Sequence, residues 1–507
     1  MSDVVIGKHT LESLTSGMYS DPYVVYREYI QNATDSIDSA YETTLLKQGE
    51  EHITITLNPL ERKIVIEDNG VGVSSNNVVK FLVSIGNSQK RSDNERGFRG
   101  IGRLSGLSYC SKLVFETSFF GESTMTRVIF DAKKLSCLLM DDTRHDVSVA
   151  DVLQQIYFID ESICLPSKHF FRVIMEGVDE SSGLNKYEGV MEFLTQNIPV
   201  PYSPTFYWGK EIVNRLKYEG YESRQYNIFL SSGTQIVQVY KPYKDVFLVD
   251  KGKGIADGIK DISIVKIQQP SGDLSAIGWI AETNYLGSIY DRSIKGIRIR
   301  KGGIQIGDSQ TLNDVFKDAR FNGWSIGELF VTDTRLVPNA RRDNFEKNPA
   351  YFNLHEQLMT IASGITKAIR TASLKRNVKL AEAMKYSDKV LYETKEEIEN
   401  GISPDRKGVI AQRVGAARKK LCAINPQFDM DVYYQSIALE ELDVLIGRIQ
   451  GATGYKAINI TNSLNRTEKK VLEQVFNVII KTVDSVTAEI LVSTILNSFK
   501  TNTRKLL

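Results

Sequence analysis

The stretch "REYIQNATDSID", from Arg27 to Asp38, combines an apolar helical face with an unusual polar one. Glu28, Asn32 and Asp35 stand three to four residues apart, so on a helix a carboxylate, an amide and a second carboxylate share one stripe. A solvated helix surface is the simplest explanation of such a stripe. A nucleotide-binding site is the alternative, and motifs further along the chain decide between the two.

The composition is that of a globular protein without a strong charge bias. The 507 residues are enough for two or three domains, and 42% of them are hydrophobic and 25% charged. The 63 basic and 62 acidic residues leave a net charge of +1, which argues against a nucleic-acid coat or a polybasic membrane anchor. Since the sequence shows neither a signal peptide nor a long apolar run, we expect a cytoplasmic protein with no membrane partner.

Cysteine and histidine usage gives no sign of a metal centre. The four cysteines form no CxxC pair, and the five histidines form no HExxH motif. We therefore expect reduced thiols and no zinc chemistry.

The pattern of apolar residues divides the chain into three regions. Helical and strand patterns alternate over residues 1–200, and the proline-rich segment Asn197–Pro204 predicts a domain boundary. Residues 201–349 are rich in strand patterns and predict an α/β middle domain. Residues 350–507 are helical in pattern and predict a bundle or a dimer interface. The expected fold class is α+β.

Two glycine-containing stretches follow the N-terminal helix. In "IEDNGVGV", a predicted strand ends at Asp68 and the chain continues through Gly70 and Gly72. The alternating pattern of this strand and of His52–Leu57 predicts a hairpin. "RGFRGIGRLSG", residues 96–106, places several glycines before a helical pattern. Such a loop favours phosphate, because its free N–H groups and the helix dipole attract anions. Each stretch alone is weak evidence.

Taken together and in this order, the three stretches resemble the motifs of the GHKL ATPase superfamily, which includes DNA gyrase B, the heat shock protein 90 chaperones, histidine kinases and MutL. Residues 81–95, "FLVSIGNSQKRSDNE", resemble the start of the mobile ATP lid, which we expect over about 81–100. The resemblance implies a Bergerat α/β sandwich for residues 1–200. It also implies magnesium-dependent hydrolysis of ATP to ADP and phosphate.

The resemblance assigns a role to each polar motif residue. Glu28 matches the general base that deprotonates the attacking water, and Asn32 matches the amide that binds Mg²⁺. One amide suffices, because Mg²⁺ keeps waters and phosphate oxygens as its other ligands. Asp68 matches the carboxylate that accepts a hydrogen bond from the adenine amino group. Asp35 matches a polar residue on the adenine side, with a helix-surface carboxylate as the alternative.

The remaining implied ATP contacts come from the glycine motifs and the lid. They are Gly70, Gly72, Ser88, Lys90, Gly97, Phe98, Arg99, Gly100, Ile101 and Gly102. For Ser88, Lys90 and Arg99, solvated lid side chains are the alternative.

A second segment resembles the catalytic loop of the heat shock protein 90 middle domain. In "LVPNARRDNFE", residues 336–346, Arg342 matches the arginine that reaches the γ-phosphate, and Arg341 is the reserve. The planar guanidinium suits this role because it binds phosphate oxygens in a bidentate way. Gyrase and MutL use a lysine instead, for which Lys301 is the candidate. A surface turn with a local ion pair is the other interpretation.

The resemblance is incomplete in two places. Where the family often has Gly-Thr before its late strand, "KHFFRVIM" offers His169 and Phe170. Residues 351–507 match no family C-terminal domain. These departures indicate a divergent heat shock protein 90-like ATPase, and similar bacterial proteins often occur in defence loci, so antiviral defence is an expectation from the resemblance.

The expected function is an ATP-driven homodimeric clamp acting on a protein client. A MutL- or MORC-type DNA clamp is the first alternative, for which the basic stretches Arg370–Lys379 and Arg413–Lys420 are candidates. A solvated helix face is the simpler interpretation of both stretches. An ATP-switched regulatory subunit of a partner effector is the second alternative.

Overall fold

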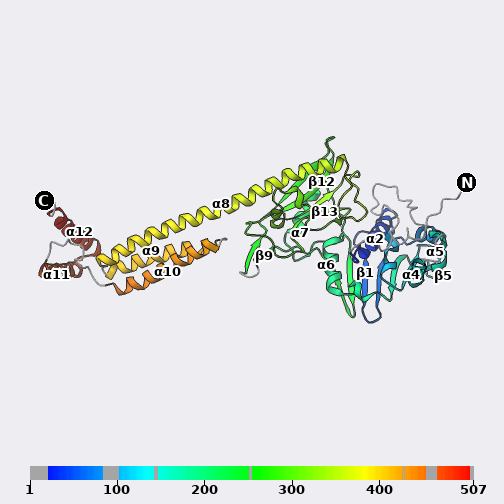
Figure 1. The fold of residues 1–507 in the computed structure, drawn as a ribbon, viewed down its shortest axis with the longest axis horizontal. Helices are drawn as coiled ribbons and strands as arrows, with labels where there is room; N and C mark the ends of the chain where they lie inside the picture. Colours follow the sequence, from blue (N-terminus) through cyan, green and yellow to red (C-terminus); the bar gives the residue numbers. More distant parts are fainter. Residues whose placement is uncertain are drawn as a thin grey trace. The chain divides into compact units, whose positions relative to one another are not determined.

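The computed structural model describes residues 21–83, 102–141, 147–250, 254–402, 404–424, 426, 429–452 and 465–502. As expected, the fold is mixed α+β, with an N-terminal α/β sheet region, a second β region and a helical C-terminal region (Figure 1). The contacts within the chain separate two compact units, Met1–Lys367 and Ala368–Leu507. The domain boundaries after residues 200 and 349 stay predictions.

An eight-stranded sheet forms the base of the N-terminal region, in the order β5-β4-β3-β6-β2-β1-β7-β8. The predicted hairpin is confirmed, because β1 and β2 pair antiparallel with Ile53 opposite Asp68. β7 pairs in parallel with β1, so strands that follow the predicted boundary complete this sheet. The strands are β1 (Ile53–Asn58), β2 (Lys63–Asp68), β3 (Lys112–Ser118), β4 (Thr124–Asp131), β5 (Tyr157–Ile163), β6 (Phe170–Glu176), β7 (Ile228–Ser232) and β8 (Gln235–Gln238).

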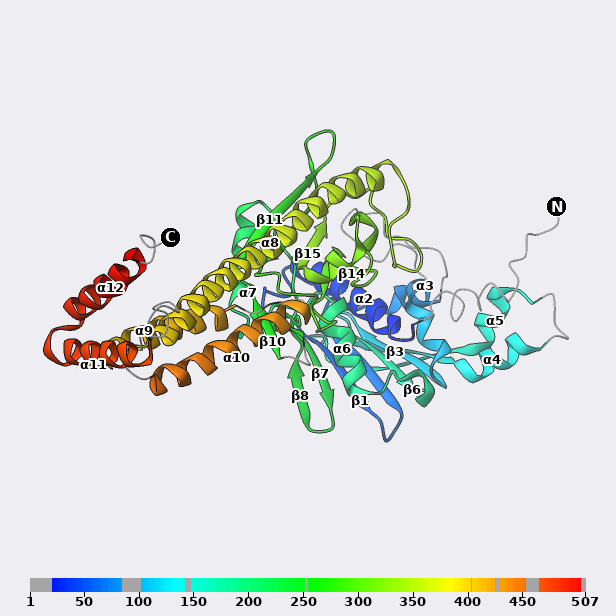
Figure 2. The same ribbon diagram turned by 60° about the vertical axis from the view of Figure 1, so that its left-hand side comes forward.

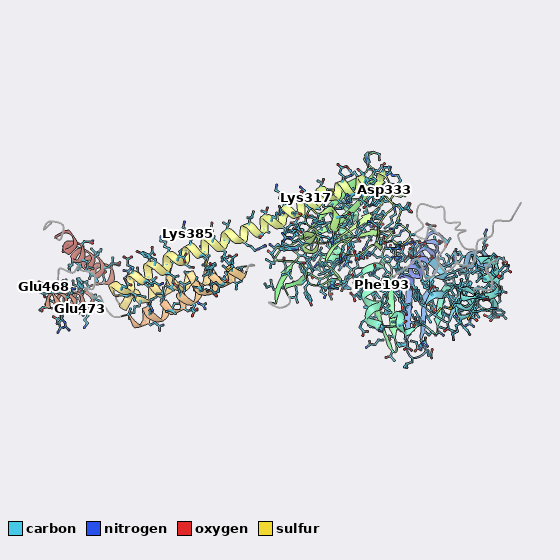
Figure 3. All side chains as sticks on the ribbon, in the orientation of Figure 1. Phe193, Lys317, Asp333, Lys385, Glu468 and Glu473 are labelled. Carbon is cyan, nitrogen blue, oxygen red and sulfur yellow. The ribbon has the colours of Figure 1, made fainter. Side chains whose placement is uncertain are left out.

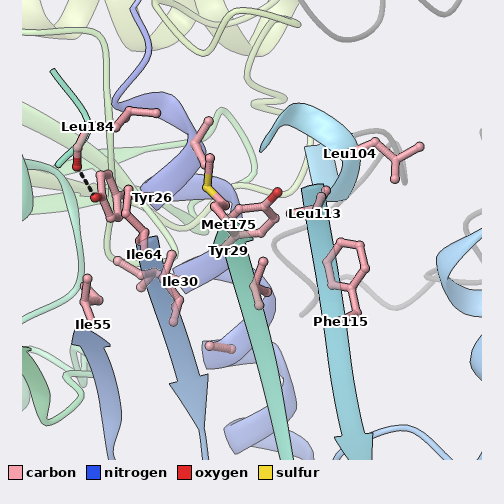
Figure 4. Close-up of a cluster of buried hydrophobic side chains, with 14 of the residues drawn as sticks. Tyr26, Tyr29, Ile30, Ile55, Ile64, Leu104, Leu113, Phe115, Met175 and Leu184 are labelled. Atoms are coloured by element: carbon pink, nitrogen blue, oxygen red, sulfur yellow. Dashed lines mark hydrogen bonds between the residues drawn. The ribbon is translucent and has the colours of Figure 1, made fainter. Parts of the chain in front are cut away.

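Helix α2 (Val24–Glu42) carries the opening motif and lies against this sheet (Figure 2). It begins after Pro22, a residue suited to a first helical turn, and the Asp21 carboxylate accepts the Tyr23 N–H at 3.0 Å. Tyr26, Tyr29 and Ile30 point into the core, where Figure 4 shows them beside residues of β2 and β3. The apolar face of α2 therefore fixes the direction of its polar stripe.

Shorter helices complete the N-terminal region. The 3₁₀ helix η2 (Gly102–Ser108) is held against α2, because the Gly106 N–H donates to the Tyr29 hydroxyl at 3.1 Å. The others are η1 (Ser75–Asn77), α3 (Val78–Leu82), α4 (Ala132–Met140), α5 (Val149–Ile156), η3 (Glu180–Ser182) and α6 (Tyr187–Asn197).

The second β region is built on a five-stranded sheet in the order β11-β12-β15-β13-β14. The fully buried Trp279 lies at its centre and packs on Tyr202 and Tyr243. The elements are α7 (Trp208–Tyr218), the paired strands β9 (Val246–Asp250) and β10 (Ile255–Gly258), β11 (Asp261–Gln268), β12 (Leu274–Glu282), β13 (Gly296–Lys301), β14 (Ile304–Ile306), η4 (Asn313–Val315), η5 (Ala319–Trp324) and β15 (Ile326–Val331).

The C-terminal region is helical, as its pattern predicts. Three of its helices share a core that includes Val414, Leu421, Leu442 and Leu445. Among the described helices, none is both long enough and apolar enough to cross a membrane. The helices are α8 (Pro349–Asn400), α9 (Pro404–Cys422), α10 (Asp429–Gly451), α11 (Arg466–Thr482) and α12 (Ser485–Asn502).

Candidate active site

Glu28 lies near the start of α2 and is held between two arginines. Its Oε1 is 3.5 Å from Nε of Arg27 and 3.6 Å from Nε of Arg342. Both carboxylate and guanidinium groups are largely withdrawn from water, with side-chain exposures of 11% for Glu28 and 15% for Arg342. The structure thus brings together the two residues that the resemblance assigns to catalysis, although they come from the N-terminal region and the second β region.

Arg342 is presented by a loop with an unusual backbone. Its φ is 56°, in the left-handed region that non-glycine residues rarely adopt. The loop is held on both sides, because the Gly307 N–H donates to the Arg342 carbonyl at 2.8 Å and the Arg342 N–H donates to the Asn339 carbonyl at 3.0 Å. These hydrogen bonds hold Arg342 in a left-handed backbone conformation that an arginine rarely adopts.

The two other candidate cations, Arg341 and Lys301, have different surroundings from those of Arg342. The Arg341 side chain is exposed. The Lys301 ammonium donates to the backbone carbonyl of Asp333, which is labelled in Figure 3 and lies two residues after the end of β15. Arg342 is the candidate cation that pairs with Glu28.

Asp68 ends β2 on the side of the sheet that α2 covers, and it is 3% exposed. Burial raises the pKa of its carboxyl to about 8, while the Gly70 N–H, which donates to Oδ1 at 2.9 Å, and the Ser36 hydroxyl oppose the shift. Within the described residues, the buried Ser36 Oγ makes no hydrogen bond of normal geometry. A polar ligand that offers hydrogen-bond partners to both groups fits this corner.

The motif glycines are needed because other groups approach them closely. A Cβ on Gly70 would lie 2.2 Å from Ser36 Oγ, and a Cβ on Gly102 would lie 2.1 Å from Glu28 Oε2. Gly72 has a φ of 71°, and its Cβ would lie 2.1 Å from the Ser118 carbonyl oxygen. The glycines therefore let the loop after β2 and the first residue of η2 lie close against α2 and β3.

Asn32 and Asp35 lie on the turns of α2 that follow Glu28, and both are partly exposed. Asn32 is therefore available to a ligand beside Glu28, as a magnesium-binding amide requires. The expected lid from residue 84 onward lies outside the described residues, and so do seven predicted contacts: Ser88, Lys90, Gly97, Phe98, Arg99, Gly100 and Ile101.

The departure from the family pattern at the late strand has a structural counterpart. The His169 Nδ1 donates to the Gly70 carbonyl at 2.8 Å, so this histidine fixes the loop after Asp68. In the register of the sheet, Phe171 lies opposite both Asp68 on β2 and Thr117 on β3. The Thr117 hydroxyl accepts the Val73 N–H at 2.8 Å.

Sequence analysis does not single out Arg27, Ser36 or Thr117. Arg27 adjoins Glu28, and Ser36 follows Asn32 by one helical turn, so their positions on α2 were a usable signal. Thr117 belongs to an ordinary strand pattern, and only the order of the strands places it near Asp68.

Comparison with known proteins matches residues 19–143 to the family of histidine kinase-, DNA gyrase B- and HSP90-like ATPases. The N-terminal region is a GHKL-type ATPase domain. The matched segment contains α2 with Glu28 and Asn32, the Asp68 loop and the glycine-rich stretch.

The chain is also distantly similar to bacterial chaperones. It is 25% identical to the chaperone protein HtpG of Rickettsia akari over 272 residues, which cover 40% of this chain and 44% of that protein. It is 22% identical to HtpG of Helicobacter hepaticus over 211 residues, or 35% of this chain and 34% of that protein. The chain therefore spans less than half the length of these relatives.

Proposed function

We propose that the chain is a magnesium-dependent ATPase in which Glu28 activates the attacking water and Arg342 stabilises the γ-phosphate. The observation that supports this most is the Arg27–Glu28–Arg342 contact, because it joins the motif helix to the second β region at the predicted reaction centre.

The base of ATP binds, in this proposal, at the corner formed by Asp68 and Ser36. A carboxyl oxygen of Asp68 accepts a hydrogen bond from the adenine amino group, and the neighbouring Ser36 hydroxyl offers a second polar contact to the base. Asn32 would hold the Mg²⁺, which would supply positive charge to the phosphates. Gly102 leaves room for the Glu28 carboxylate at the point where the phosphates end.

The ion pair between Glu28 and Arg342 implies a conformational step. Arg342 exchanges the carboxylate for the γ-phosphate when ATP is bound, which releases Glu28 to face the water. Such a step, together with lid closure, makes turnover slow. We propose that two copies of the chain form a clamp that closes in the ATP state on a protein client, in line with its distant similarity to HtpG chaperones. A role in antiviral defence rests on the resemblance alone.

Among the residues that the structure describes, no observation favours a DNA clamp. In the basic stretch Arg413–Lys420, Arg413 pairs with Glu397 at 2.7 Å and Arg418 with Asp443 at 2.6 Å. These charges hold helices of the C-terminal region together and are partly neutralised.

The test compares Glu28→Ala with the control Glu61→Ala, which removes an exposed carboxylate in the turn between β1 and β2. We expect Glu28→Ala to lose a factor of about 10²–10⁴ in single-turnover ATP hydrolysis, because that is the usual contribution of a general base. Calorimetry with a non-hydrolysable ATP analogue should give similar affinities for both variants. Hydrolysis at the control's rate would remove Glu28 from the mechanism.

The clamp is tested separately by light scattering of Glu28→Ala with and without ATP and Mg²⁺. A nucleotide-dependent change in the dimer supports the clamp. Duplex DNA is added at two salt concentrations, and retention that depends on both ATP and low salt would replace the protein client by DNA.

A further inference from the structure

Arg300 is a buried arginine in the second β region that the proposed chemistry does not use. It lies on β13, and 1% of its surface is exposed. Its guanidinium binds three groups: Nε donates to Glu328 Oε1, Nη1 to the Gly303 carbonyl at 3.1 Å, and Nη2 to the Gln196 carbonyl at 2.7 Å. One side chain thus links β15, the β13–β14 turn and the last turn of α6.

Glu328 binds two of the three chain segments that cross between the two sheets. Its carboxylate accepts from the Lys241 ammonium at 2.6 Å and from the Tyr202 hydroxyl. Tyr202 lies between α6 and α7, and Lys241 lies between β8 and β9. Two of the three crossings between the eight-stranded sheet and the second β region, the one before α7 and the one after β8, are therefore attached to one carboxylate on β15.

The free-energy cost of removing these charges from water offsets much of the stability that the cluster contributes. Two cations share one carboxylate in a site that water does not reach, and burial lowers the pKa of Lys241 to about 8 while the two cations hold the pKa of Glu328 down to about 2. Replacing buried ion pairs by apolar side chains is often neutral or stabilising. The geometry of the cluster, in contrast, is highly specific, because each polar group has a defined partner.

The β13–β14 hairpin connects this cluster to Arg342. Immediately after β14, the Gly307 N–H binds the Arg342 carbonyl, and a Cβ on Gly307 would lie 2.6 Å from the Asp343 carbonyl oxygen. At the turn of the hairpin, Gly303 has a φ of 82°, and its Cβ would lie 2.7 Å from Cβ of Pro199. The hairpin is thus seated on the segment after α6 at one end and supports the Arg342 loop at the other.

We propose that Arg300 is a positioning residue for ATP hydrolysis. By binding the end of α6, Arg300 fixes the position of the β13–β14 hairpin, and the hairpin in turn fixes the position of Arg342 relative to Glu28. The inference rests on the proposed function. Gln196 offers a carbonyl in the last turn of a helix, where a cation is favoured. A lysine keeps the charge, but its three donors sit on one nitrogen, so it cannot span the three acceptors that Nε, Nη1 and Nη2 of Arg300 reach separately.

The test compares Arg300→Lys with Arg298→Lys. Arg298 lies two residues earlier on the same strand and is 3% exposed, but its Nη2 binds the carbonyls of Arg292 and Ser293, and within the described part of the chain it forms no hydrogen bond to α6. Both substitutions are made in the full chain and again in the Arg342→Ala background. For each variant, kcat, KM and the affinity for a non-hydrolysable ATP analogue are measured, and folding is checked by circular dichroism.

We expect Arg300→Lys to lower kcat by a factor of about 10–100, since misplacement by about 1 Å has effects of this size, with nucleotide affinity unchanged. In the Arg342→Ala background the same substitution should have no further effect, because its influence passes through Arg342. A loss that Arg298→Lys shares, or a loss that adds to that of Arg342→Ala, would overturn the inference.

A second variant covers a failure of Arg300→Lys to fold. Gly303→Ala leaves the buried charges in place and moves the hairpin away from Pro199, so it should reproduce the fall in kcat; unchanged kcat overturns the inference. A failure of the proposed function itself is recognised by a different result, that of Glu28→Ala. If Glu28→Ala hydrolyses ATP as fast as the unchanged chain, the proposed function is wrong whatever Arg300 does.

Discussion

Gly102→Ala tests the position of the proposed base Glu28 directly, because the substitution adds a single methyl group next to the Glu28 carboxylate. The new Cβ would lie 2.1 Å from Oε2, 2.8 Å from Cδ and 3.0 Å from Cγ of Glu28. Heavy atoms in contact are separated by roughly 3.5 Å, so the carboxylate oxygen has to retreat by more than about 1 Å. The φ of Gly102 is not in the positive region, so the backbone itself accepts an alanine.

The expected result is a loss of hydrolysis without a loss of fold. A displacement of about 1 Å at a reacting group costs about 10²-fold in rate, and we expect a fall of this order in single-turnover ATP hydrolysis. The Glu28 side chain is flexible, so the melting temperature should change little. Affinity for a non-hydrolysable ATP analogue should fall far less than the rate.

The matched control is Gly364→Ala in α8, where an added Cβ meets no atom within 4 Å. It should leave the rate unchanged and stabilise the helix by up to about 1 kcal/mol. The reasoning is refuted if Gly102→Ala folds and hydrolyses ATP at the rate of this control. A rate equal to that of Glu28→Ala would show that displacing the base is as damaging as deleting it.

Three further predictions use the same geometry. Gly72→Ala should lower the free energy of unfolding in urea by more than about 1 kcal/mol, because its φ of 71° and the Ser118 carbonyl both exclude a Cβ; an unchanged midpoint would contradict this. Since the folded-state pKa of Asp68 is raised to about 8 from an ordinary 3.8, its contribution to stability should be lost as pH rises between these values, and Asp68→Asn should remove that slope from melting temperatures measured across the range. A chain ending at Lys367 keeps the first compact unit whole and should be a monomer in light scattering, whereas a dimer would locate the interface outside residues 368–507.

Local physical chemistry explains why the sequence predicts the first part of the site. The repeat of the α-helix places Glu28, Asn32 and Asp35 on one stripe, and the apolar residues of the same helix determine which face is buried. Strict alternation predicts β1 and β2, which form the observed hairpin. The short segments α4, α5 and β5 escape prediction, because a few residues carry too little periodic signal.

Only the tertiary structure places Arg342 beside Glu28, Phe171 opposite Asp68, and β7 next to β1. Each of these contacts depends on the order and register of strands far apart in the chain, which local periodicity does not encode. The same holds for Arg300 and Glu328. In the sequence they are charged residues in strand patterns, and it is burial against Gln196, Tyr202 and Lys241 that turns them into a connection between the two sheets. By itself the sequence determines the local elements and the motif residues they carry, whereas the long-range packing decides which of those residues meet.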